Sequence, residues 1–137
     1  MRYLVLGIFL LMPKTIAADS EQTSNDRIGL VSMVQLLANP EEYNEKAVEV
    51  IGFLRLEFEG NELYLHEDDY LHGITKNGLW IDLSPDLRDD AAKLNMHYVL
   101  VGGTFSAKKK GHMSMASGSI NASIASVWPN TRLRRRP

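Results

Sequence analysis

The run of residues 48–58 constrains the fold more than any other part of the sequence. Its even positions are apolar or glycine: Val48, Val50, Gly52, Leu54, Leu56 and Phe58. Charged side chains fill most of the odd positions, and this period of two is typical of a strand that buries one face. Gly52 lies between Ile51 and Phe53, which predicts a bend or bulge where the strand passes from one sheet into another.

Gly60-Asn61 follows this run and predicts a two-residue hairpin loop, because both residue types tolerate positive φ. Residues 62–66 would then return as a second strand, antiparallel to the first. Its alternation places Tyr64 and His66 on the outer face, with leucines inward. We expect a loop over residues 67–78 after this strand.

Five further elements can be placed from the sequence. Ser32 and Gln35 have the spacing of a capping box, which predicts a short helix that ends at Asn39-Pro40. The other predicted elements are a strand over 79–83, a helix from Ser84-Pro85-Asp86, and strands over 97–105 and 120–128. The apolar residues of 79–83 alternate, so Leu79, Ile81 and Leu83 are expected to face the core.

The predicted order is helix, strand, strand, strand, helix, strand, strand. A long bent first strand, a hairpin and a helix between the third and fourth strands match the five-stranded Greek-key barrel called the OB-fold. We therefore expect a mainly β protein whose OB-fold-like barrel spans residues 31–129, with an unrelated α+β sheet as the alternative. In this scheme residues 19–30 are a flexible lead and residues 130–137 a basic tail.

The first 18 residues have the layout of a secretory signal peptide. Arg2 precedes an apolar run over 3–12, which is too short for a bilayer core that needs about 20 residues, and Ala17-Ala18 offers a cleavage site. We therefore expect a periplasmic or secreted protein with no transmembrane span after cleavage. A retained membrane anchor is the alternative. Since the chain has no Cys, it must fold without disulfides.

Charge is distributed unevenly along the chain. Residues 19–131 carry 9 Lys and Arg against 17 Asp and Glu, a net charge of −8, whereas four arginines lie within residues 132–136. The tail is compatible with weak contact to an anionic surface, although a solvated tail is the simpler interpretation because it has no apolar anchor. The acidic body favours a basic partner.

Residues 39–65, NPEEYNEKAVEVIGFLRLEFEGNELYL, resemble the opening of a known group of proteins. The pattern NPxxYxxKxVxVxGFL is similar to that of small exported bacterial proteins with an OB-fold-like domain, many of them uncharacterised. The likeness continues through residues 66–83 and, more weakly, over 111–120. This resemblance implies an exported ligand-binding protein with an OB-fold, and it brings no catalytic residues.

The sequence carries no signature of catalysis. It has no Cys, and the serines around Gly118 lack the G-x-S-x-G elbow, so we expect a protein that is not an enzyme and needs no cofactor. One alternative is a metal-binding module at residues 66–72, HEDDYLH, where two His and several carboxylates would converge. This segment lacks the H-E-x-x-H and EF-hand spacings, so a solvated acidic loop is the simpler interpretation.

A second alternative is an OB-fold binder of single-stranded nucleic acid, which would use the outer face of the second and third strands. Suitable aromatic and basic residues are Arg55, Tyr64, His66, Trp80, Lys108, Lys109 and Lys110. Glu57, Glu62 and Asp82 share the same strands, however, and a body at −8 would repel phosphate. Nucleic acid is therefore disfavoured as a partner.

We expect instead a binding protein that recognises a protein partner or a small envelope ligand. Tyr64, Tyr70 and Trp80 would serve as aromatic anchors beside the basic residues named above and the loops at 67–78 and 106–118. One specific form is an inhibitor or immunity protein against an exported toxin or hydrolase, since an acidic body speeds association with a basic partner. Simple packing of the aromatic side chains is the competing explanation.

Overall fold

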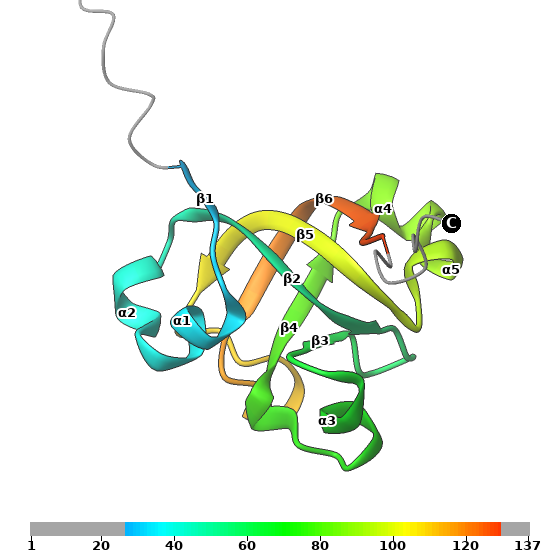
Figure 1. Cartoon of the computed structure of the whole chain (residues 1–137), viewed down its shortest axis with the longest axis horizontal. Helices are drawn as coiled ribbons and strands as arrows, with labels where there is room; N and C mark the ends of the chain where they lie inside the picture. The colour runs from blue at the N-terminus through cyan, green and yellow to red at the C-terminus, as the bar shows by residue number, and fades with distance from the viewer. Residues whose placement is uncertain (1–26, 130–137) are drawn as a thin grey trace, which may run out of the picture.

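The computed structural model describes residues 27–129 (Figure 1). The predicted signal peptide and the basic tail lie outside the described residues. The strands are β1 Arg27–Leu30, β2 Ala47–Arg55, β3 Glu62–Tyr64, β4 Gly78–Leu83, β5 His97–Ser106 and β6 Ser119–Val127. The helices are α1 Met33–Ala38, α2 Pro40–Tyr43, α3 Glu67–Leu71, α4 Pro85–Asp89 and α5 Ala91–Leu94, with 3-10 turns η1 Thr75–Asn77 and η2 His112–Ser114.

Five strands close into a barrel in the order β2-β3-β4-β6-β5, and β5 pairs back to β2. β4 and β6 run parallel, while the other neighbours in the barrel are antiparallel. With α4 and α5 between β4 and β5, this connectivity is that of an OB-fold-like barrel, so the predicted fold class is confirmed. Figure 1 shows α1 and α2 near one side of the barrel, α3 below it and α4 and α5 on the opposite side.

A sixth strand, β1, joins the barrel through a parallel pairing with the start of β2. The prediction that the flexible lead extends to residue 30 is therefore wrong for residues 27–30. The Val31 N–H also donates to the Glu49 carbonyl, at 2.8 Å, which continues the contact beyond the strand. The sequence did not predict this strand for two reasons. The residues before it are polar, and four residues are too few to show a period.

The barrel core follows the alternation of the strands. The most fully buried side chains include Leu36, Val50, Leu54, Leu63, Leu79, Ile81, Val99, Val101, Phe105 and Ile120. Leu79, Ile81 and Leu83 all face inward as expected, because successive strand residues point to opposite faces. Leu94 of α5 is buried as well, and Leu87 and Ala91 pack against the same core.

Gly52 lies where β2 changes neighbours along one edge. Before it, Ala47 to Glu49 pair with β1, and after it Phe53 to Arg55 pair with β3. A Cβ at position 52 would come within 2.6 Å of the Tyr64 carbonyl oxygen and 2.8 Å of Leu63 Cγ. Only a glycine lets the two strands approach this closely. The pairing of β2 with β5 continues through Gly52 without a register shift, so the glycine is needed for this close approach and the predicted bulge is absent.

The predicted two-residue hairpin is wrong. Pairing of β2 with β3 begins at Arg55 and Glu62, so residues 56–61 form a six-residue connection, and neither Gly60 nor Asn61 has positive φ. The Leu56 N–H leaves the sheet because it donates to Asn95 Oδ1 at 2.9 Å. Phe58, expected on the buried face, is consequently fully exposed, at 100%.

The helices are short and are defined by their caps. In α1, Gln35 N–H donates to Ser32 Oγ at 3.2 Å and Ser32 N–H donates to Gln35 Oε1 at 3.1 Å, which confirms the predicted capping box. Pro40 then begins α2, since a proline at the first helical position sacrifices no hydrogen bond. No helix among residues 27–129 has the length and apolar character to cross a bilayer.

The segment 67–78, expected to be a loop, contains α3 and η1. Asp69 is buried and holds the segment together. Its Oδ2 accepts the His66 N–H at 3.0 Å, and its Oδ1 accepts Asn77 Nδ2 at 2.9 Å. Acidic residues in the first turn of α3 also complement the positive end of the helix, a signal that the acidic-loop interpretation overlooked.

Candidate binding clefts on the β3–β4 face

Two adjoining clefts lie on the outer face of β3 and β4. The first, here the aromatic cleft, has a volume of about 200 Å³ and is lined by Arg55, Glu57, Glu59, Gly60, Glu62, Tyr64, Tyr70, Thr75, Trp80, His112 and Met115. The second, here the lysine cleft, measures about 520 Å³ and is lined by Glu59, Trp80, Asp82, Lys109, Lys110, Gly111 and His112. Because Glu59, Trp80 and His112 line both, the clefts form one continuous depression.

Hydrogen bonds between distant segments hold the walls of the aromatic cleft together. Thr75 Oγ1 donates to the Met115 carbonyl at 3.3 Å, and Lys76 Nζ donates to the Ser114 carbonyl at 3.1 Å. Ser117 Oγ donates back to the Lys76 carbonyl at 2.7 Å. The turn η1 and the β5–β6 loop are thereby joined, which gives the cleft a preformed shape.

Tyr70 lines the aromatic cleft and belongs to an aromatic cluster. Its ring centroid lies 6.0 Å from that of Phe53, stacked, and 5.8 Å from that of Tyr64, tilted. The Arg55 guanidinium carbon lies 5.6 Å from the Tyr70 centroid, within the range of a cation–π contact. Arg55 Nε also pairs with Glu57 Oε1 at 2.8 Å. The guanidinium is thus held by a ring and a carboxylate together.

Tyr64 lies on the outer face of β3 as predicted, yet it is 7% exposed. The reason is its neighbours, because Tyr70 covers it and Gly78 across the strand pair leaves room for its ring. Its hydroxyl donates to Glu62 Oε2 at 2.5 Å. Burial raises the pKa of Glu62, although this hydrogen bond acts in the opposite direction. Burial also raises the pKa of Tyr64, and the hydrogen bond to Glu62 raises it further.

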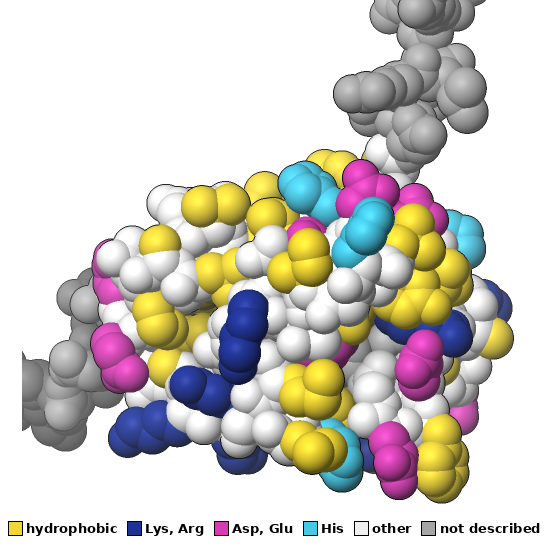
Figure 2. Space-filling view, turned by 90° about the horizontal axis from the view of Figure 1, so that it is seen from below, with side chains coloured by type: hydrophobic (Ala, Val, Ile, Leu, Met, Phe, Trp, Pro, Cys, Tyr) yellow, Lys and Arg dark blue, Asp and Glu magenta, His cyan; other side chains and the backbone are white. Residues whose placement is uncertain are grey.

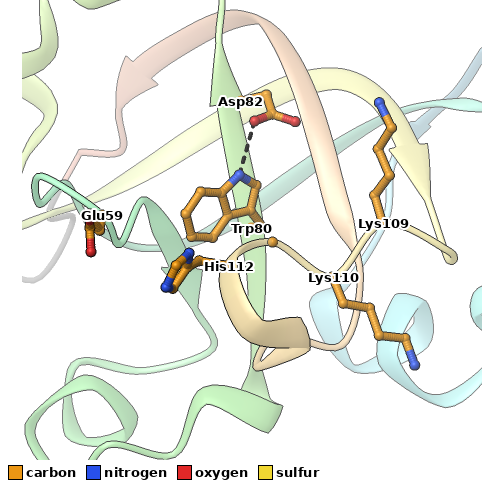
Figure 3. A pocket seen from close by; sticks show the side chains of 7 residues that line it. Glu59, Trp80, Asp82, Lys109, Lys110 and His112 are labelled. Atoms are coloured by element: carbon orange, nitrogen blue, oxygen red, sulfur yellow. Dashed lines mark hydrogen bonds between the residues drawn. The ribbon is translucent and has the colours of Figure 1, made fainter.

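Trp80 separates the two clefts. Its Nε1 donates to Asp82 Oδ1 at 2.9 Å (Figure 3). Figure 3 shows Glu59 and His112 on one side of the indole and Lys109 and Lys110 on the other, with Asp82 at the indole nitrogen. Gly111 packs directly against the ring. The indole is therefore covered by the backbone of the β5–β6 loop.

Figure 2 shows the end of the molecule that carries α3 and the β5–β6 loop, seen from below. Most of the visible Lys and Arg side chains gather on the left part of this face, and hydrophobic and acidic side chains are spread among polar ones. Exposed Met113, Met115 and Ile74 belong to the segments that surround the aromatic cleft. A mixture of apolar and charged groups of this kind suits a specific contact with a partner.

The structure therefore brings together only some of the predicted site residues. Arg55, Tyr64, Tyr70 and Trp80 line the aromatic cleft, and Lys109 and Lys110 line the lysine cleft. Two residues lie elsewhere. Lys108 is exposed and lines neither cleft, and His66 lines a separate, largely apolar cleft beside β1.

Sequence reasoning missed several lining residues of the aromatic cleft. Glu59, His112 and Met115 were not included, and Glu57 and Glu62 were weighed only as groups that repel phosphate. Glu57 and Glu59 alternate up to Gly60, so a pair of carboxylates on one side of the connecting segment was visible in the sequence. His112 comes from the β5–β6 loop, which was expected beside the site only as the segment 106–118, and nothing in the sequence singled out this residue within it.

The proposed metal-binding segment adopts a different role. Asp69 is engaged in capping α3, and His72 Nδ1 lies 2.8 Å from the Asp68 carbonyl oxygen. Within residues 27–129, no group of three or more His, Asp or Glu side chains is arranged to hold a metal ion. Of the segment 66–72, Tyr70 lines the aromatic cleft and His66 lines the cleft beside β1.

Comparisons with known proteins found no matching family model and no matching curated protein. The chemistry of the two clefts is consequently the basis for any functional assignment. What they offer is a preformed shape, aromatic surface and charges of both signs.

Proposed function

We propose that this chain is an exported, non-catalytic binding protein, and that the two clefts recognise a protein partner or a small envelope ligand. The observation that carries the proposal is the convergence of Arg55, Tyr64, Tyr70 and Trp80 on one cleft, with Lys109 and Lys110 in the next. The outer face of the second and third barrel strands, with the adjacent loops, is the surface that OB-folds use for binding.

Internal pairing of the polar groups supports a binding role. Arg55 is paired with Glu57, Tyr64 with Glu62 and Trp80 with Asp82. These pairs hold side chains in one geometry, and preorganised side chains lower the entropic cost of association. An inhibitor or immunity protein is the specific form that we favour, because the net charge of −8 over residues 19–131 would attract a basic target.

The alternative of a nucleic-acid binder gains less support from this geometry. Stacking requires open ring faces, whereas Tyr64 is buried and Gly111 packs on Trp80. Glu57, Glu59 and Glu62 also surround the aromatic cleft, where phosphate would meet repulsion.

The test is an affinity capture from envelope extract with three proteins: the unchanged chain, Glu59→Lys and Asp89→Lys. Glu59 is exposed and lines both clefts, while Asp89 is also an exposed acid, lies at the end of α4 and lines neither. A partner captured by the unchanged chain and by Asp89→Lys, but lost with Glu59→Lys, would support the proposal. Capture of the same partner by all three proteins would argue against the clefts.

A further inference from the structure

The aromatic cleft already holds one cation by a defined chemistry. The Arg55 guanidinium carbon lies 5.6 Å from the Tyr70 ring centroid, and its Nε lies 2.8 Å from a Glu57 carboxylate oxygen. A ring face and a carboxylate together compensate the hydration that a cation loses on entering a cleft. In this cleft, Tyr70 and Glu57 therefore already bind one cationic group, the guanidinium of Arg55, with a ring and a carboxylate.

A second ring-and-carboxylate set lies in the same cleft. Glu59 and Glu62 line it together with Tyr64 and Trp80. No Lys, Arg or His side chain in the described part of the chain forms an ion pair with either glutamate. Lys76, whose charge acts on Glu62, donates its amine to the Ser114 carbonyl, and Arg55 is committed to Glu57.

Glu62 distinguishes this set from an ordinary acidic surface. It is 7% exposed, and Tyr64 donates to one of its two carboxylate oxygens. A buried carboxylate is costly unless it is paired and hydrogen-bonded, and burial has raised the pKa of Glu62. A positive charge entering the cleft would relieve this cost.

We propose that Glu59, Glu62, Tyr64 and Trp80 form a binding site for an alkylammonium group, as carried by a lysine side chain or by a free amine. This inference rests on the proposed binding function and specifies its ligand. An ammonium group has three N–H donors for the two carboxylates, and, unlike a nucleotide base, it needs no open ring face to stack on. The volume of about 200 Å³ accommodates a single such side chain.

Binding is best followed by the indole N–H signals in a nitrogen-15 NMR titration. The chain has two tryptophans, Trp80 in the cleft and Trp128 just after β6, so each protein carries its own internal control. The probes are n-pentylamine, a short glycine-flanked lysine peptide with blocked ends, and the same peptide with an acetylated lysine amine. Acetylation removes the charge and leaves the four-carbon chain of the lysine in place.

We expect the two charged probes to shift the Trp80 signal in a saturable, salt-sensitive way and to leave Trp128 unchanged. The acetylated peptide should bind at least tenfold more weakly. Tighter binding of the lysine peptide than of n-pentylamine would identify a protein segment as the natural source, and equal binding a free amine. Equal binding of the charged and acetylated peptides, or an unmoved Trp80 signal at millimolar probe, would overturn the inference.

Conservative variants locate the site. Glu59→Gln and Glu62→Gln should each weaken binding of the charged peptide by at least threefold. Asp89→Asn changes an exposed acid outside both clefts and should bind the peptide as the unchanged protein does. Normal binding by both glutamine variants would place the ammonium elsewhere and refute the assignment. If amine probes fail while the captured partner still depends on Glu59, the binding function stands and only the ligand class is wrong.

Discussion

Gly111 packs so closely on the indole of Trp80 that a Cβ at position 111 would lie 2.2 Å from Trp80 Cε3 and 2.3 Å from Cδ2. Its φ of 68° is also in the left-handed region that favours glycine. The backbone of the β5–β6 loop therefore sets the position of the indole that separates the two clefts. A change in the loop backbone should therefore move the indole and alter the shape of both clefts.

Gly111→Ala should displace Trp80 as well as strain the loop. The positive φ alone costs about 1–2 kcal/mol, and forced repacking adds about 1–3 kcal/mol. The control is Gly73→Ala, since Gly73 has a similar φ of 66° but no atom within 4 Å of a new Cβ. Near-ultraviolet circular dichroism should change in the tryptophan region for Gly111→Ala only. Identical spectra for the two variants would show that the contact does not position the indole.

Asp69→Ala should loosen the wall that carries Tyr70. The carboxylate of Asp69 accepts hydrogen bonds from the His66 N–H and from Asn77, and the loss of a cap and a buried bond costs about 1–3 kcal/mol. Urea unfolding measures the change. Asp68→Ala, in the same first turn but exposed, should cost less than about 0.5 kcal/mol. Equal losses in the two variants would contradict the role given to Asp69.

Much of the barrel could be predicted because the order of apolar and polar residues along a strand shows which side chains are buried. The apolar side chains at the even positions of β2 and Leu79, Ile81 and Leu83 of β4 point to the core, so the period of two was sufficient to predict both strands, although Ile51, Phe53 and Trp80 lie on the other face. The helix at Ser32 could be predicted for a similar reason, since both halves of its capping box lie within four residues.

Features that depend on distant residues could not be predicted. The hairpin failed because Asn95 accepts the Leu56 N–H, and the sequence near Gly60 contains no trace of that bond. Likewise, the aromatic residues of the clefts could be selected by type, but not the fact that Gly111 covers Trp80. His66 was misplaced because alternation was extended past Tyr64, where β3 ends and the chain turns into α3.

Gly52→Ala should be among the most damaging single substitutions in the barrel. A Cβ there would meet the Tyr64 carbonyl oxygen at 2.6 Å, and a backbone atom within a sheet has little freedom to move. We expect a loss of about 1–3 kcal/mol or more, measured by urea unfolding. At Gly102 a Cβ would meet side-chain atoms only, Ile124 Cδ1 and Cγ1 at 3.1 Å and Glu49 Cγ at 3.4 Å, and these can move more easily than backbone, so Gly102→Ala should be far milder. A milder effect at Gly52 than at Gly102 would refute the close approach of β2 and β3.

Glu62→Gln should make the protein more stable at pH 8 and have little effect at pH 4. Burial raises the pKa of Glu62 in the folded state, so the folded protein binds this proton more tightly than the unfolded chain. That contribution is complete below the unfolded value of about 4.3 and is lost as the pH rises through the raised pKa. Glutamine stays neutral throughout and can still accept the Tyr64 hydroxyl.

The charged groups that act on Glu62 are Glu57, which raises its pKa further, and Lys76, which lowers it, and both are kept in the variant. Urea unfolding of the unchanged protein and Glu62→Gln at pH 4 and pH 8 therefore isolates the buried carboxylate. Glu59→Gln is the matched control, because this glutamate lines the same cleft but is exposed. A variant Glu62→Gln that is less stable at pH 8 would mean that ionised Glu62 is compensated in the free protein, and the argument for a missing cation would lose its energetic basis.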